Sequence, residues 1–403
     1  MDPFRKAYCR VFQAVLRLAI PFLPYRRPEI VDSVAKVPAA VRGPGRAGVL
    51  IVTDPGVAAL GLTGQLEKAL RLASIPFTVF DQVEANPTTD TIEAASALYR
   101  QKRCQAIIAM GGGSSIDCGK AVGIRIVKPD KPLRKCRGIL KVRAKLPQLI
   151  AIPTTAGTGS ETTLAAVITD SQTRHKFTIN DFPLIPQCAV LDPEMTHSLP
   201  PFLTATTGMD ALTHAVEAYI GRSTTPDTRA DALEAVRLIF ANIDRAYTDG
   251  EDRTARRNML HAAFRAGCAF TKSYVGYVHA VAHSLGGEYN VPHGYANAVI
   301  LPMVLDYYGS AVHQQLKDLA VAVGLAGEDT PLAEAARTFI DAIKDMKRRF
   351  SIGNTIPELK REDINKLSRY ADKEANPLYP VPVLLGAGEL RRFYKMLLEE
   401  DEL

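Results

Sequence analysis

The chain has 403 residues, of which 47% are hydrophobic and 23% charged, and its formal net charge is +6 at pH 7. This composition excludes a largely disordered protein and is typical of a soluble globular chain long enough for two domains. The 6 cysteines show no CxxC spacing, which argues against a zinc ribbon or a disulfide framework and favours a reducing, cytoplasmic compartment.

The positive charge is concentrated in two runs. Residues 1–50 carry nine basic against three acidic residues, and the run Lys128–Lys145 carries eight basic residues against Asp130 alone. Each run is either a solvated face or a contact for anionic lipid or an acidic partner. Neither run shows the aromatic pattern or the fold motif of a nucleic-acid-binding protein, so we expect no nucleic acid partner.

The segment Phe4–Leu23 predicts an amphipathic helix that ends at Pro21 and Pro24. Its apolar residues recur at helical spacing, and its basic residues lie mostly off that stripe. Four charges in twenty residues argue against a membrane-spanning helix. Three roles remain open for this extension: docking onto the body or a partner subunit, attachment to a membrane surface, and a targeting peptide.

From residue 47 the pattern alternates between strands and helices. Strands are predicted over 48–53, 77–80, 105–110 and 149–152, and helices over 64–73 and 89–102. Near-continuous apolar strands separated by helices predict a parallel sheet that is covered on both faces. Such sheets bind ligands at the carboxyl ends of their strands.

Two small-residue loops follow two of these strands. The sequence GGGSSID after Met110 provides backbone N–H groups at a helix N-terminus for a phosphate, and PTTAGTGS after Ile152 provides hydroxyls for ribose or phosphate. Tight packing is the alternative reading of the first loop. Asp54, after the first strand, is placed to accept from a ribose 2′-hydroxyl and to repel a 2′-phosphate, which favours NAD over NADP; its alternative role is to form a turn.

Beyond Leu191 only helices are predicted, over 202–220, 225–248, 252–285, 296–323, 330–348, 361–373 and 387–400, followed by an acidic tail. The first of these helices carries Asp210 and His214 four residues apart on one face. They can supply a carboxylate oxygen and an imidazole to one ion, although such a pair is more often a hydrogen bond on a helix surface.

Three of the eight histidines lie within fifteen residues: His279, His283 and His293. The first two share a helix face, Gly286 and Gly287 fit a helix C-terminus, and Pro292 can turn His293 back toward the same pocket. Burying three imidazoles without a metal or substrate leaves too many polar groups unsatisfied. Together with a carboxylate they suit Fe(II) or Zn(II), which acts as a Lewis acid on an alcohol, and a dinucleotide supplies the hydride acceptor.

From about residue 28 the sequence resembles the iron-containing (group III) alcohol dehydrogenases, through GGGSSID, PTTAGTGSE, GMDALTHAVEAY and HAVAHSLGG followed by PHGYANAVILP. The resemblance implies a dehydroquinate synthase-like α/β architecture: an N-terminal parallel-sheet nucleotide-binding domain (28–195) and a C-terminal all-helical metal-binding domain (196–403). Residues 1–27 form a basic helical extension. A homodimer is implied, acting on a small alcohol or aldehyde; the alternatives are a lyase resembling dehydroquinate synthase and a membrane-associated module with reduced catalytic role.

The resemblance also implies the site residues. It assigns the metal to Asp210, His214, His279 and His293, and it makes His283 a neighbour of substrate and nicotinamide that relays a proton. The implied cofactor residues are Asp54, Asn86, Gly112, Gly113, Ser114, Asp117, Thr154, Thr155, Thr158, Val167 and Lys176. Phe270, Tyr274 and Tyr277 precede the metal histidines and are either channel-lining or core residues.

Overall fold

A computed structural model describes residues 1–42 and 48–398, and the predicted acidic tail with the end of the last predicted helix lies outside this range. The chain divides into two compact units. A sheet unit comprises Pro24–Leu199 with Gly250–Phe264, and a helical unit comprises Met1–Leu23, Pro200–Asp249 and Arg265–Leu403. Each unit therefore draws on separate stretches of the sequence.

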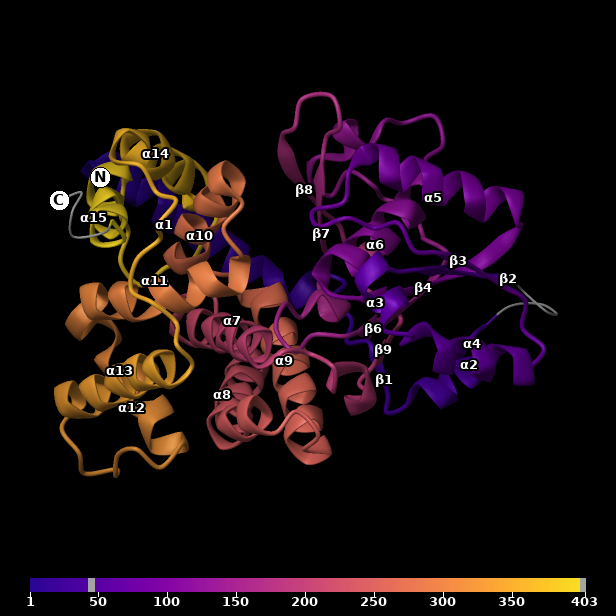
Figure 1. Cartoon of the computed structure of the whole chain (residues 1–403). Helices are drawn as coiled ribbons and strands as arrows, with labels where there is room; N and C mark the ends of the chain where they lie inside the picture. The colour runs from indigo at the N-terminus through magenta and orange to yellow at the C-terminus, as the bar shows by residue number, and fades with distance from the viewer. Residues whose placement is uncertain (43–47, 399–403) are drawn as a thin grey trace. The chain divides into compact units, whose positions relative to one another are not determined.

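The sheet unit is built on a six-stranded, wholly parallel sheet in the order β1-β9-β6-β4-β2-β3 (Figure 1). The four predicted strands agree with four of these to within one residue at each end. Gly111 at the end of β4 pairs with Pro153 at the end of β6, so the two small-residue loops begin side by side. The strands are β1 (Glu29–Val31), β2 (Gly48–Val52), β3 (Phe77–Phe80), β4 (Cys104–Gly111), β6 (Gln148–Pro153) and β9 (Cys188–Val190).

Helices cover both faces of this sheet because alternate strand residues are apolar on each side. On one face Leu50 and Ile107 pack with residues of α5 (Thr89–Gln101) and α6 (Gly113–Val127). On the other face Val49 and Ile108 pack with α2 (Val37–Ala40) and α4 (Thr63–Leu72). This is the covered parallel sheet that the sequence predicts.

A second, three-stranded sheet in the order β5-β8-β7 was not predicted. It consists of β5 (Gly138–Ile139), β7 (Ala165–Thr169) and β8 (Lys176–Asn180), with β7 and β8 antiparallel. These strands are only two to five residues long and alternate in burial, so they lack the continuous apolar runs that marked the main sheet.

Of the helices predicted after Leu191, two are each divided. The predicted helix over 252–285 is α9 and α10, separated by Tyr274 with a positive φ of 62°. The one over 296–323 is interrupted at Gly309 (φ 50°), and the predicted end at Gly286 and Gly287 is wrong, because the helix continues to the left-handed Asn290. The helices are α7 (Pro201–Ile220), α8 (Pro226–Thr248), α9 (Arg253–Ser273), α10 (Tyr277–Tyr289), α11 (His293–Tyr308), α12 (His313–Ala322), α13 (Leu332–Arg349), α14 (Ile364–Ala375) and α15 (Ala387–Met396).

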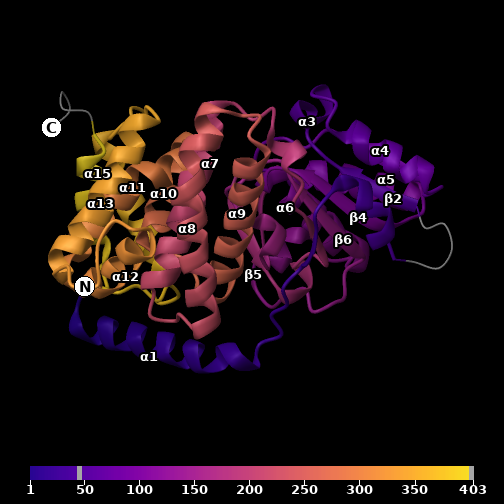
Figure 2. The ribbon, with the colours of Figure 1, turned by 90° about the horizontal axis from the view of Figure 1, so that it is seen from below.

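The basic N-terminal segment forms α1 (Pro3–Ala19), continued by a 3-10 turn over Ile20–Phe22, and lies along the outside of the helical unit (Figure 2). It is docked, but not by its apolar stripe. Arg5, Arg10 and Gln13 hydrogen-bond to residues between 372 and 382, whereas most of the large apolar side chains, Phe4 to Phe22, are exposed. Among the described residues, no helix has the length and hydropathy needed to cross a membrane.

Candidate metal centre and cofactor cavity

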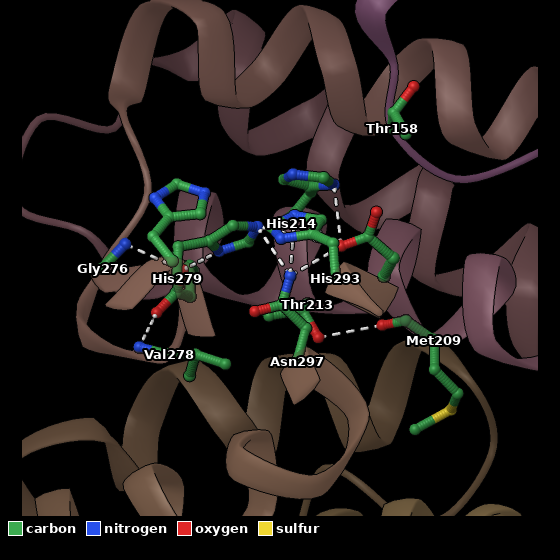
Figure 3. Close-up of polar contacts among 12 residues, drawn as sticks. Thr158, Met209, Thr213, His214, Gly276, Val278, His279, His293 and Asn297 are labelled. Atoms are coloured by element: carbon green, nitrogen blue, oxygen red, sulfur yellow. Dashed lines mark hydrogen bonds and ion pairs between the residues drawn. The ribbon is translucent and has the colours of Figure 1, made fainter. Parts of the chain in front are cut away.

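The metal ligands implied by the resemblance lie together inside the helical unit. Ligand atoms of Asp210, His214, His279 and His293 all lie within 4.8 Å of one another. They come from three helices: α7 places two of them one turn apart, α10 contributes His279, and His293 is the first residue of α11 after the turn at Pro292. Figure 3 shows the three imidazoles turned toward one another and toward Asn297.

The close approach of α7 and α11 depends on a glycine next to a ligand. A Cβ at Gly294 would lie 2.5 Å from the carbonyl oxygen of Thr206, one turn before Asp210. A side chain of any size at this position would therefore push His293 away from the carboxylate. Glycine, which lacks a Cβ, lets the backbones of α7 and α11 approach this closely.

The donor chemistry of the cluster fits a divalent cation. The Asn297 Nδ2 donates to Asp210 Oδ1 at 2.7 Å and lies 3.1 Å from the Nε2 atoms of both His279 and His293. An amide nitrogen has two hydrogens, so three acceptors converge on it and one is left over. A cation satisfies such an excess of acceptors, and ligand bonds of about 2.0–2.2 Å would need only modest contraction of the cluster.

Two ligand histidines are held neutral, which metal binding requires because only an unprotonated nitrogen can coordinate. Desolvation and the neighbouring imidazoles hold the pKa of His279 well below its ordinary value. Desolvation also lowers the pKa of His293 to about 4, although Asp210 opposes this shift. Both rings therefore offer a lone pair at neutral pH.

Glu217 orients His279 and is a functional residue that the sequence reasoning missed. Its Oε2 lies 2.6 Å from His279 Nδ1, and the carboxylate accepts from the backbone N–H groups of Gly276 and Val278. Burial raises the pKa of Glu217 to about 7, and the two backbone donors oppose this. By accepting from Nδ1–H, the carboxylate leaves Nε2 of His279 free to face the other ligands. The signal was present, since residues 210, 214 and 217 share one helix face.

His283 lies beside the cluster and is paired with a second carboxylate that was not anticipated. Its ring is stacked on His293 with centroids 5.2 Å apart, and its Nδ1 lies 2.6 Å from Glu374 Oε1, which also accepts from the Tyr379 hydroxyl at 2.8 Å. Desolvation alone would lower the pKa of His283, but Glu374 outweighs it and the pKa is raised. The side chain of His283 remains 40% exposed, so it can exchange a proton.

The aromatic residues before the metal histidines have different roles. Phe270 stacks on His214 with centroids 4.2 Å apart and so closes one side of the cluster. Tyr277 is a core residue rather than a channel wall, because it is fully buried and its hydroxyl contacts Asn376 and the carbonyl of Leu385. Tyr274 occupies the left-handed turn between α9 and α10.

The sheet unit has a cavity of 460 Å³ at the carboxyl ends of β2 and β4, within the size range of small-molecule sites. Four of the predicted cofactor residues line it: Asp54, Gly112, Gly113 and Ser114. Asp54 caps α3 (Pro55–Ala59) through Val57 N and accepts from the Ser115 hydroxyl. The predicted turn-forming role of Asp54 and its position at the cavity therefore coexist.

The remaining predicted cofactor residues do not line this cavity, although some of them contact residues that do. Asn86 has a φ of 57° and donates its backbone N–H to the Ser114 hydroxyl. Asp117 accepts from Ser160 and from the backbone N–H of Val167, tying α6 to the second loop and to β7. Beyond the cavity lining lie Thr154, Thr155 and Thr158 in the second loop, Val167 in β7, and Lys176 at the start of β8, where burial lowers the pKa of Lys176.

Comparison with known proteins identifies the class. Residues 30–193 match the family described as iron-containing alcohol dehydrogenase, and residues 204–383 match the Fe-containing alcohol dehydrogenase family, C-terminal. The chain belongs to this family. It is therefore an oxidoreductase of the alcohol dehydrogenase type, as the sequence predicts.

Individual relatives and solved structures show the degree of similarity. The 1,3-propanediol dehydrogenase of Klebsiella pneumoniae is 39% identical over 331 residues, covering 81% of this chain and 85% of the relative. A crystal structure of 1,3-propanediol oxidoreductase is 35% identical with a TM-score of 0.87, covering 92% of this chain and 97% of that one. Sulfoacetaldehyde reductase from Bifidobacterium kashiwanohense, in complex with NAD+, is 28% identical with a TM-score of 0.82, covering 93% and 98%. The predicted cofactors, NAD and iron, are confirmed for the family: its description names iron, and the last structure contains NAD+.

Proposed function

We propose that Asp210, His214, His279 and His293 hold Fe(II), with Zn(II) as the alternative ion, and that the enzyme transfers a hydride between NAD(H) and a small alcohol or aldehyde. The convergence of these four ligands carries the proposal. A bound divalent ion supplies Lewis-acid polarisation of the substrate oxygen. Two of the relatives are named for 1,3-propanediol and sulfoacetaldehyde, both short molecules, which supports a small substrate.

His283 is the proposed catalytic residue and moves the proton of the alcohol. Glu374 and Tyr379 hold its Nδ1 side, so the Nε2 atom is the one that is available to exchange a proton. Partial exposure of the side chain gives that proton a route to solvent. A histidine that is positioned by a carboxylate, and whose pKa that carboxylate raises, is suited to this transfer.

The proposed cofactor residues are the predicted set, with NAD preferred over NADP. Asp54 supports this preference because each of its oxygens retains an acceptor position beyond its contacts with Val57 and Ser115. A carboxylate here accepts from a ribose hydroxyl and repels a phosphate. The set is Asp54, Asn86, Gly112, Gly113, Ser114, Asp117, Thr154, Thr155, Thr158, Val167 and Lys176.

The remaining proposals concern organisation. The domains are 1–27, 28–195 and 196–403, and the chain forms a homodimer, on the strength of the family resemblance. A cytoplasmic location is supported by six free cysteines with no disulfide framework. Peripheral contact with a membrane surface is supported by the outward apolar face of α1.

Substitution of one ligand tests the proposed chemistry. His279→Ala is expected to lose bound iron and alcohol-dependent NADH formation together, since the ring contributes a ligand from inside the cluster. His313→Ala, at the start of α12 and outside the cluster, is the matched control and should keep both. Full activity in a metal-free His279→Ala enzyme would refute the proposal. Metal content and NADH absorbance over a panel of short alcohols are the measurements.

A further inference from the structure

The apolar stripe of α1 faces away from the body along the whole helix. Its six large side chains are spaced four, three, four, three and four residues apart, which keeps them on one face. Phe4 is 89% exposed, Leu18 74% and Phe22 87%. The stripe, defined by these six residues, consists of Phe4, Tyr8, Val11, Val15, Leu18 and Phe22.

The opposite face is held to the helical unit by specific polar contacts. Arg5 forms a bidentate pair with Asp372, with both N–O distances 2.8 Å. Arg10 donates to the carbonyls of Val381 and Pro382, and Gln13 donates to the carbonyl of Tyr379. The buried Cys9 completes this face. Because these contacts hold the inward face of α1, the helix presents the stripe already folded and oriented. Binding through the stripe therefore needs no further ordering of the chain.

Charge decides which partner suits the stripe. Residues Pro3–Ala19 contain the basic residues Arg5, Lys6, Arg10 and Arg17 and no acidic residue. Arg5 and Arg10 are engaged by the body, so the exposed Lys6 and Arg17 are the basic residues of α1 outside these contacts. A second copy of α1 would bring these positive charges together, with no acidic residue in Pro3–Ala19 to pair with them. A surface of anionic lipid instead attracts them, because both lie within a helix diameter of roughly 10–12 Å of the stripe, comparable to the Debye length of about 8 Å in physiological salt.

We propose that α1 attaches the enzyme peripherally to membranes containing anionic lipid, with the stripe inserted among the acyl chains and with Lys6 and Arg17 near the headgroups. Aromatic side chains near both ends of the stripe suit the interfacial region, where rings are favoured. This inference rests on the peripheral membrane contact proposed above and specifies anionic lipid as the partner. It is independent of catalysis, because the metal cluster and the cofactor cavity contain no residue of α1.

Vesicle co-sedimentation of the intact chain tests it. The protein should sediment with vesicles of phosphatidylcholine and phosphatidylglycerol, and sodium chloride should weaken that binding. Much less should sediment with phosphatidylcholine alone. The triple substitution Val11→Gln, Val15→Gln and Leu18→Gln should reduce the bound fraction at least about tenfold, since each removes apolar area from the stripe. Its NADH formation should equal that of the parent, which shows that the variant is folded.

Leu72→Gln, a site 79% exposed at the end of α4, is the matched control and should bind vesicles as the parent does. Equal sedimentation of parent and triple variant would overturn the proposal. Failure of the parent to sediment with either vesicle type would also overturn it. Light scattering gives the oligomeric state of the parent and of the triple variant. If the parent is a dimer, the variant is a monomer and neither binds lipid, the stripe is a subunit interface instead.

Discussion

The metal cluster and the cofactor cavity are built from different parts of the chain. The cluster is made of side chains, with Asp210 and His279 at most 2% exposed. Asn297 contacts three of the four ligands, and Glu217 holds His279. The lining of the cavity includes the glycine-rich turn of Gly112 and Gly113 at the start of α6. A side chain can be deleted whereas a backbone N–H cannot, so single substitutions should harm the cluster more than the cavity, except where a glycine of this turn is replaced.

Replacing Glu217 should produce the largest effect, although this residue would not touch the metal. Glu217→Leu leaves the N–H groups of Gly276 and Val278 and the ring of His279 without their acceptor in a buried site. Each unsatisfied donor costs about 1–3 kcal/mol, and loss of such an orienting carboxylate lowers metal affinity about 10- to 100-fold. Iron titration and thermal unfolding measure both effects.

Glu217→Gln is the control for this substitution. It keeps one acceptor oxygen and the shape of the side chain, so its iron affinity should lie between those of the parent and Glu217→Leu. Parent-like iron affinity in the leucine variant would show that the cluster does not need its orienting residue.

Replacing Gly111 should be the most harmful change in the cofactor loop. Its φ is 148°, and an added Cβ would lie 2.4 Å from the Ser115 hydroxyl. Backbone strain of this kind costs about 1–3 kcal/mol. A loop that shifts to relieve it moves Gly112 and Gly113 out of the cavity lining, which weakens NAD binding by up to the same energy, roughly 5- to 150-fold. Gly111→Ala should therefore raise the KM for NAD while iron content stays unchanged. Ser114→Ala, which removes a side chain from the same loop, should change the KM for NAD by only a few fold. Equal effects of the two substitutions would show that this loop depends on its side chains as much as on its glycines.

Glu374→Gln should have a moderate effect that depends on pH. The carboxylate raises the pKa of His283, so its removal lowers that pKa. His283 must be neutral to accept the proton of an alcohol, and the acid limb of the kcat/KM profile should shift to lower pH, with the maximum reduced about tenfold. Glu288→Gln, which breaks the pair of Glu288 with Lys366, is the control and should leave the profile in place. An unshifted acid limb in Glu374→Gln would remove Glu374 from the relay.

Asp54→Ala should have the smallest effect. Removing one partly exposed carboxylate beside the ribose is expected to improve the kcat/KM for NADP relative to NAD about fivefold. Loss of the α3 cap adds about 1 kcal/mol of destabilisation. The measurement is the ratio of kcat/KM for NADP to kcat/KM for NAD. An unchanged ratio would show that the ribose 2′-position does not lie beside Asp54.

The same difference between the two sites explains what could be predicted from the sequence. The main strands follow from apolar runs, and the pairing of Asp210 with His214 follows from their i, i+4 spacing. The choice of His279 and His293 as the other two ligands, with His283 beside them, came from the family resemblance. Glu374 could not be found in this way, because it lies 91 residues from His283 in the sequence. The direction in which α1 docks was also unpredictable, since its amphipathic pattern does not show that polar contacts, led by Arg5 and Asp372, hold it to the body.

Anomalous diffraction from crystals of the iron-loaded enzyme tests the central claim most directly. We expect one strong iron peak in the helical unit, within about 2.0–2.3 Å of an Asp210 oxygen and of one ring nitrogen each of His214, His279 and His293. An iron peak elsewhere, or one that two or more of these four side chains fail to reach, would contradict it.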